Sequence, residues 1–149
     1  MNKKNFKNPD AYRNYDIKEE IEVGIVLKGS EVKSIRNGNA SLKDTYAIIK
    51  KSEMYILNMY IKPYEHGANF NPDSTRMRKL LLHKKEILKI QNNIKKERLS
   101  LIPIKMYFKK NKVKILLGIG KGKKLHDKRQ DMAKKDAEMK INRIKNRYI

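Results

Sequence analysis

The sequence predicts a mainly β protein with helices (α+β), namely a small closed antiparallel β-barrel with two or three packed helices and a basic C-terminal tail. Three observations predict this fold. Short segments rich in β-branched and aromatic residues recur with turn signals between them. Two other segments have the three- and four-residue apolar spacing of amphipathic helices. The composition changes near residue 120, which divides the chain into a folded body, residues 1–120, and a tail, residues 121–149.

Six segments have the composition of strands: residues 22–28, 45–51, 54–60, 78–83, 101–109 and 113–119. The links at residues 51–53 and 110–112 have hairpin length, so the strands beside them are expected to be antiparallel neighbours. Residues 61–75, which contain two prolines and a glycine, are expected to form a loop. A barrel follows, because closing the sheet removes exposed strand edges in a body of this size.

The first predicted helix covers residues 31–36. Ser30 is its predicted N-cap, Val32 and Ile35 share one face, and Gly38 is placed to end it. The second predicted helix covers residues 84–97, where three isoleucines, Ile87, Ile90 and Ile94, form an apolar stripe that can pack on a sheet.

The tail has a helical pattern of its own. Small, apolar and aromatic residues recur there at spacings of three and four: Ala133, Ala137, Ile141, Ile144 and Tyr148. Because this stripe is thin and the surrounding lysines and arginines repel one another, we expect the tail to be disordered when free and helical against a partner.

The composition favours a polyanionic partner. The chain carries 37 Lys and Arg against 16 Asp and Glu, a formal net charge of +21 over 149 residues. Each phosphate that Lys or Arg neutralises releases condensed counterions, which makes such a surface bind nucleic acid. We expect the partner to be RNA, and binding to a membrane surface is the less favoured alternative.

The absence of cysteine excludes disulfides, thiolate metal sites and cysteine nucleophiles, and it fits a cytosolic protein. The N-terminus lacks the apolar run of a signal peptide, and no stretch reaches the about 18 to 20 apolar residues of a membrane span. We therefore expect a soluble, cytoplasmic monomer.

The first predicted helix carries candidate RNA-binding residues. Lys33 and Arg36 lie three residues apart and can meet the same phosphate ridge, although a solvated helix face is an equally good interpretation. Glu31 lies at the start of that helix, where a carboxylate interacts favourably with the helix dipole.

Arg76, Arg78 and Lys79 come immediately before a run of apolar strand residues, so their charge gathers at one end of the predicted barrel. Phosphate contact is one interpretation of these cations. The alternative is that they keep an apolar strand from aggregating.

The densest basic motif covers residues 118–129. Its alternating glycines let the backbone approach a phosphate, and Lys121, Lys123 and Lys124 supply the charge. A flexible linker is the alternative. The motif lacks the Gly-Lys-Ser/Thr ending of a nucleotide-hydrolysing loop.

The sequence predicts neither a metal site, nor a cofactor, nor an enzyme. His66, His83 and His126 are far apart and lack acidic or cysteine companions at ligand spacing. No recognisable catalytic constellation is present, so we predict a protein that acts by binding. His126 offers an aromatic plane that can stack on a base.

Four segments carry a resemblance to a known family. They read GIVLKGSEVKSIRNG at residues 24–38, SLKDTY at 41–46, RMRKLLLH at 76–83 and GKGKKLHDKR at 120–129. In these segments, which occur in the family's order across almost the whole chain, the sequence resembles SmpB, the family of bacterial SsrA-binding proteins that are partners of tmRNA in trans-translation.

The resemblance implies a barrel of the oligonucleotide-binding type that binds the tRNA-like domain of tmRNA and enters a stalled ribosome with it. The tail would then lie in the small-subunit decoding centre and the empty mRNA channel and become helical there. Together with the cations of residues 76–79, the tmRNA-side candidates are Glu31, Lys33, Arg36, Arg76, Arg78, Lys79, Lys121, Lys123 and Lys124. The ribosome-side candidates in the tail are His126, Asp127, Lys128, Arg129, Lys134, Lys135 and Arg143.

The chain departs from the family pattern at two places. Pro9 and Asp10 replace cations in the N-terminal segment, and Ala137 stands where members often carry Trp. Apart from the resemblance, a general RNA chaperone or a ribosome-surface protein that binds by charge is the alternative function. An RNA nuclease comes third.

Overall fold

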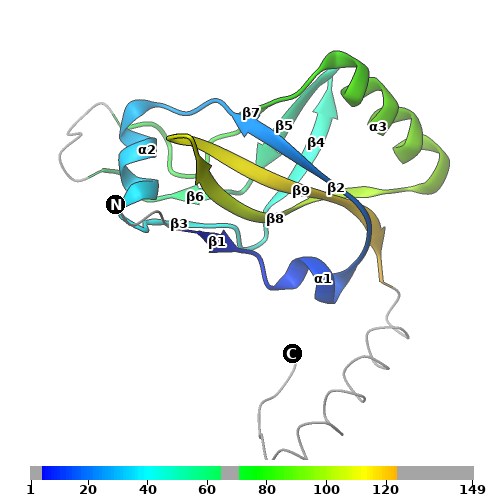
Figure 1. The fold of residues 1–149 in the computed structure, drawn as a ribbon, viewed down its shortest axis with the longest axis horizontal. Coiled ribbons are helices and arrows are strands. Elements are labelled where there is room, and N and C mark those ends of the chain that lie inside the picture. Colours follow the sequence, from blue (N-terminus) through cyan, green and yellow to red (C-terminus); the bar gives the residue numbers. More distant parts are fainter. Residues whose placement is uncertain (1–4, 65–70, 124–149) are drawn as a thin grey trace, which may run out of the picture.

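The computed structural model describes residues 5–64 and 71–123 (Figure 1). Its elements follow one another as β1 (Phe6–Lys7), α1 (Asp10–Asn14), β2 (Tyr15–Ile25), α2 (Gly29–Arg36), β3 (Ala40–Ser41), β4 (Tyr46–Lys50), β5 (Glu53–Leu57), β6 (Tyr60–Ile61), β7 (Arg78–Leu81), α3 (Lys84–Glu97), β8 (Ser100–Lys109) and β9 (Lys112–Gly122). The predicted fold class, a mainly antiparallel β protein with helices, is confirmed.

Six strands form a ring. Strand β8 pairs with β4, and the order continues through β5, β7, β2 and β9 back to β8, with antiparallel pairing throughout. The short strand β1 pairs with β8 at Lys105 and Met106, and β3 and β6 form a separate two-stranded sheet. The ring leaves few unpaired strand edges, which protects a small β protein from association through its edges.

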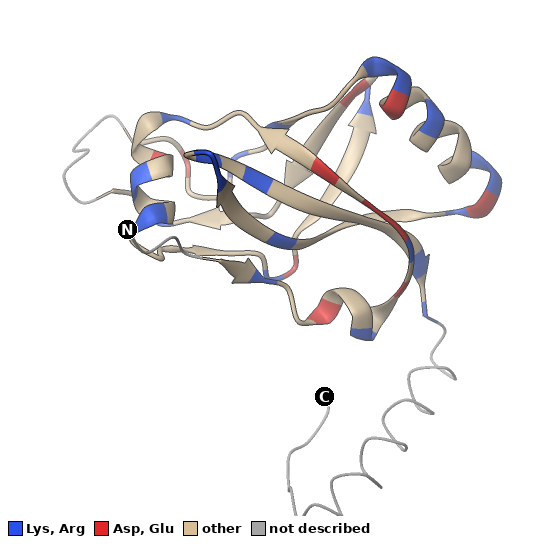
Figure 2. Ribbon diagram, viewed as in Figure 1, with Lys and Arg blue, Asp and Glu red and all other residues tan. Residues whose placement is uncertain are grey.

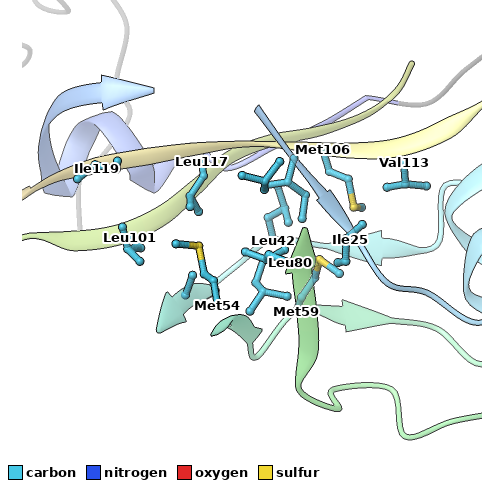
Figure 3. Close-up of a cluster of buried hydrophobic side chains, with 14 of the residues drawn as sticks. Ile25, Leu42, Met54, Met59, Leu80, Leu101, Met106, Val113, Leu117 and Ile119 are labelled. Atoms are coloured by element: carbon cyan, nitrogen blue, oxygen red, sulfur yellow. The ribbon is translucent and has the colours of Figure 1, made fainter. Parts of the chain in front are cut away.

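The core lies inside this ring (Figure 3). Strand β9 shows why the sequence folds this way: Val113, Ile115, Leu117 and Ile119 alternate along it, and each is at most 7% exposed. Because alternate side chains of a strand point to the same face, all four enter the core. Burying each of them contributes about 2 kcal/mol before the entropy of ordering is counted.

The helix predicted over residues 84–97 is confirmed with the same bounds. Ile87 and Ile90 of α3 are buried and Ile94 packs against the core. At the N-terminus of α3, Glu86 accepts a hydrogen bond from the backbone N–H of His83 at 3.1 Å. This contact satisfies one of the donors that a helix start leaves free.

The start of α2 corrects a prediction. Its N-cap is Lys28 and not Ser30, because the carboxylate of Glu31 accepts a hydrogen bond from the backbone N–H of Lys28 at 2.8 Å. Ser30 therefore lies within the first turn. The predicted end is confirmed, since Gly38 has φ 81° just after the helix and its N–H bonds the carbonyl of Ile35.

Both predicted hairpins are confirmed. Each has a two-residue turn in which both residues have positive φ, at Lys51 and Ser52 and at Lys110 and Asn111. This is the geometry of a type I′ turn, whose twist matches that of the flanking strands.

Three strand predictions need correction. Strand β2 covers Tyr15–Ile25 and not residues 22–28, and it follows a short helix, α1, that was not predicted. The predicted strand at residues 54–60 is divided between β5 and β6, because Asn58 has φ 64° and interrupts the extended backbone. Strand β9 continues past residue 119 to Gly122.

Two parts of the prediction lie outside the described residues: the middle of the loop, residues 65–70, and the tail from residue 124 onward, which includes its apolar stripe. The division of the chain near residue 120 therefore stays a prediction.

Candidate nucleic-acid interface

Glu31 is the centre of a buried ionic cluster at the start of α2. Its carboxylate is 3% exposed and accepts hydrogen bonds from Arg76, at 2.7 and 3.1 Å, and from Nε of Arg78, at 2.7 Å. Burial raises the pKa of the Glu31 carboxyl, but the hydrogen bonds from Arg76, the Lys28 backbone and Arg78 outweigh it. The pKa therefore lies below its ordinary value, and the group is a carboxylate at neutral pH.

Arg78 is fully buried, and its guanidinium joins several segments of the chain. Nη1 donates to the carbonyl oxygens of Met59, at 2.6 Å, and of Arg76, at 3.2 Å, while Nη2 donates to that of Ser74 at 3.1 Å. Burial lowers the pKa of Arg78, and the ion pair with Glu31 opposes that effect. Arginine has so high an intrinsic pKa that it stays protonated here. Its donors thus hold α2 against β7 and the segment before it.

Arg76 differs from Arg78 in being partly exposed, at 25% of its side chain. The two-pronged contact with Glu31 fixes the plane of its guanidinium at the protein surface. Glu31 therefore orients one surface arginine and one buried arginine, which the sequence alone had grouped together as surface candidates.

The exposed side of α2 presents Lys33 and Arg36, each beside an aromatic ring. Lys33 Nζ lies 5.5 Å from the centre of the Tyr64 ring, and the Arg36 guanidinium lies 5.5 Å from that of Phe108 in β8. These distances are those of cation–π contacts. The contacts restrict two long side chains, so less conformational entropy would be lost on binding a phosphate.

Strands β7, β2 and β9 form a face with residues that were not predicted to be functional. Gly24 of β2 pairs with Leu81 of β7 on one side and Lys114 of β9 on the other. A Cβ at Gly24 would lie 3.2 Å from Leu81 Cβ and 3.7 Å from Lys114 Nζ, so the two side chains approach each other across the glycine. A glycine inside a strand pattern is the sequence signal for such an approach.

Other exposed side chains extend this face. Val26, whose N–H bonds the carbonyl of Lys79, is 45% exposed, and Leu81 is 51% exposed. Lys79 itself forms an ion pair with Glu53 at 3.2 Å. The face therefore combines exposed apolar side chains with lysines, which suits the sugars and phosphates of RNA.

Glu22 lies on the same outer face of β2 and binds two residues of β8. Tyr107 donates a hydrogen bond to its carboxylate, and Lys109 Nζ lies 3.2 Å away. The hydrogen bonds from Tyr107 and Lys109 lower the pKa of Glu22. In turn, burial and the Glu22 carboxylate raise the pKa of Tyr107 to about 12.

The predicted cations lie at two ends of the molecule (Figures 1 and 2). Helix α2 and the basic β8–β9 hairpin lie at one end, and β9 finishes at the other, where the tail begins. At that second end Lys121 pairs with Glu97 of α3 at 3.7 Å, and the N–H of Lys123 bonds the carbonyl of Asn14. Lys121 and Lys123 therefore do not share a surface with Lys33 and Arg36.

The remaining candidates lie outside the described residues: Lys124, His126, Asp127, Lys128, Arg129, Lys134, Lys135 and Arg143. Within residues 5–64 and 71–123, no group of three or more His, Cys, Asp or Glu side chains is arranged to hold a metal ion. A helix long and apolar enough to cross a membrane is also absent from this part of the chain.

Comparison with known proteins gives a consistent result. The family profile described as SmpB protein matches residues 5–147. The chain is 52% identical to an SsrA-binding protein of Staphylococcus haemolyticus, over 95% of this chain and 92% of that protein. It is 54% identical to one of Acetivibrio thermocellus, over 92% and 89%.

A solved structure is also similar. It is described as "tmRNA-SmpB: a journey to the center of the bacterial ribosome". The two chains are 42% identical, the match covers 81% of this chain and 85% of the other, and the TM-score is 0.67. The likeness therefore holds in sequence and in fold.

Proposed function

Because the chain belongs to the SmpB family, we propose that it is an RNA-binding protein without enzymatic activity that binds tmRNA and acts in trans-translation on the ribosome. The observation that carries this proposal is 52% identity to an SsrA-binding protein over 95% of the chain. The net charge of +21 supports it, because binding one RNA and entering a particle made largely of RNA both require many cations.

We further propose that the ring of strands is a barrel of the oligonucleotide-binding type. The strand order supports it. Around the ring β4, β5 and β7 are followed by β2, β9 and β8, and in the chain α3 lies between β7 and β8. Strand β2 is then an added strand inserted between β7 and β9. In such barrels the loops and one sheet face bind nucleic acid.

In this proposal the α2 end of the body contacts the tRNA-like domain of tmRNA. Lys33, Arg36 and Arg76 supply the phosphate contacts, since their charged groups are at the surface and each is held by a neighbour. Glu31 and Arg78 act indirectly: they fix the position of α2 and the orientation of Arg76. This assignment explains why a carboxylate belongs in a surface that binds an anion.

The face around Gly24, with Lys79, Leu81 and Lys114, continues this RNA-binding surface along β7, β2 and β9. Lys121, Lys123 and Lys124 form a second contact near the start of the tail. The tail, with His126, Asp127, Lys128, Arg129, Lys134, Lys135 and Arg143, enters the decoding centre and the empty mRNA channel. The protein works in the cytoplasm as a monomer.

The α2 assignment is tested by the salt dependence of tmRNA binding. Replacing Lys33 or Arg36 by alanine is expected to weaken binding and to reduce the slope of log Kd against log salt by about 1 for each lost phosphate contact. Lys50→Ala, at the exposed end of β4 away from α2, is the matched control and should leave the slope unchanged. Equal slopes for all three variants would place the tmRNA contact elsewhere.

A further inference from the structure

The ring of strands has a seam between β4 and β8, where strand pairing is shorter than at any other contact in the ring. Strands β2 and β9, and likewise β8 and β9, pair along nearly their whole length. In contrast, β4 and β8 pair only at Ala47 and Leu101 among the described residues. The two strands share no further paired position among the described residues, and residues of both line a groove.

A groove of about 490 Å³ lies at the seam. It runs from β4, at Tyr46 to Ile49, past Gln91 and Lys95 of α3, to Ser100 at the start of β8. A second hollow of about 250 Å³ adjoins it and shares Tyr15, Tyr46 and Ile102. The larger volume falls within the range of about 300 to 1,000 Å³ that small-molecule sites occupy.

The lining has the chemistry of a nucleobase site. Tyr46 is 40% exposed and lines both hollows, so it is the aromatic side chain of the groove on which a base would stack. Isoleucines form the apolar walls, while Gln91 and Ser100 supply an amide and a hydroxyl that can bond the edge of a base. Single-stranded RNA is commonly bound in this way, by stacking on aromatic rings with hydrogen bonds to base edges.

The charges around the groove indicate how a nucleotide would lie in it. Lys95 lines the larger hollow, and Lys121 reaches the end of α3 beside it through the pair with Glu97. The smaller hollow is lined instead by Asp10 and Asp44, which repel phosphate. A phosphate therefore belongs at the Lys95 end.

We propose that this groove binds a single unpaired nucleotide of an RNA partner, with its base stacked on Tyr46 and its phosphate beside Lys95. The groove also gives a role to the end of the motif at residues 41–46, which the α2 surface does not use, because Tyr46 lines the groove and Asp44 and Thr45 line the smaller hollow beside it. The proposal does not depend on which RNA supplies the nucleotide. A result that disproves nucleotide binding in the groove therefore leaves tmRNA binding at α2 untouched. A result that disproves tmRNA binding at α2 likewise leaves the groove proposal untouched.

The test uses the full chain and labelled hexaadenylate, a single-stranded probe without base pairs. Tyr46→Ala is expected to weaken binding at least about fivefold, the loss of one stacked base. Tyr46→Phe, which keeps the ring, should bind like the parent. Tyr60→Ala is the matched control, since Tyr60 is 41% exposed but belongs to β6, and it should change the Kd less than about twofold.

Amide chemical shifts locate the probe. Hexaadenylate should shift the amides of Ile48, Gln91 and Ser100. Equal losses for Tyr46→Ala and Tyr60→Ala, or shifts confined to α2, would overturn the proposal. Groove shifts that follow protein concentration without RNA would assign the groove to a second copy of the chain and would also overturn it.

A second pair of variants tests the groove independently, so that the test holds even if Tyr46→Ala does not fold. Lys95 and Lys89 are both exposed on α3, but only Lys95 is among the residues that line the larger hollow. Lys95→Gln is expected to weaken hexaadenylate binding more than Lys89→Gln does. Equal affinities of these two variants would contradict the proposal independently of Tyr46.

Discussion

Glu31 is a buried carboxylate that holds two arginines from a segment about 45 residues away in the chain. Glu31→Gln is expected to lower the free energy of unfolding by about 3 to 5 kcal/mol, because the amide leaves Arg78 buried without its counter-charge. Urea denaturation measures this loss.

Glu97→Gln is the control for Glu31→Gln. Glu97 also pairs with a cation, Lys121, but both side chains are about half exposed. An exposed pair contributes at most about 1 kcal/mol, so the control should unfold almost like the parent. Similar losses in the two variants would mean that the buried cluster does not stabilise the fold.

Single residues also show the limit of sequence reasoning about the site. The motif at residues 76–79 reads as a run of surface cations, yet Arg78 is buried and Arg76 is partly exposed. Alternation along β7 explains the difference, since Arg78 and Leu80 face inward while Lys79 and Leu81 face outward. A buried arginine was not expected, because its partner Glu31 lies on another element.

At the scale of elements, α2 has one glycine in its first turn and another just after its end, and the two have different roles. Gly38 has φ 81° just beyond its end, whereas a Cβ at Gly29, in its first turn, would meet nothing within 4 Å. Gly38→Ala should therefore cost about 1 to 2 kcal/mol of stability, because an L-residue is strained in the left-handed region.

Gly29→Ala is the matched control and should be neutral or stabilising by up to about 1 kcal/mol, since it reduces the entropy of the unfolded chain. Thermal unfolding of both variants measures the difference. Equal melting temperatures would show that the turn after α2 does not require glycine.

The elements with a regular apolar pattern could be predicted, and those without one could not. Helix α3 has isoleucines at helical spacing on a polar background, and its predicted bounds are confirmed. The first half of β2 is rich in charge, and its register shifts between Ile17 and Glu19, which disturbs the two-residue alternation that marks a strand. Helix α1 is only five residues long, too short for a periodic signal.

At the scale of the whole molecule, the candidate RNA-binding residues of α2 lie at one end and those of β9 lie at the end where the tail begins. A chain that ends at Lys124 keeps every described element. It is expected to retain most of its affinity for tmRNA and to lose the tagging of stalled nascent chains. Filter binding and a tagging assay with the same preparation measure the two properties, and joint loss of both would contradict a division of labour.

The sequence predicts a closed sheet, but the order of the strands around it exceeds what local patterns predict. The sequence predicts the hairpins, because turn residues and strand lengths are local, but the pairing of β2 with both β7 and β9 joins distant parts of the chain. The seam between β4 and β8 likewise joins residues more than 50 positions apart in the chain, Ala47 and Leu101. Such long-range pairing leaves no pattern in one sequence.

The central claim, that this protein binds tmRNA specifically, is tested most directly by competition. The Kd of the full chain for tmRNA is measured at about 0.15 M salt while a structured RNA of the same length competes. We predict that tmRNA is preferred by several kcal/mol, a factor of about a hundred or more. Equal displacement by the unrelated RNA would show a protein that binds by charge alone and would contradict the proposed function.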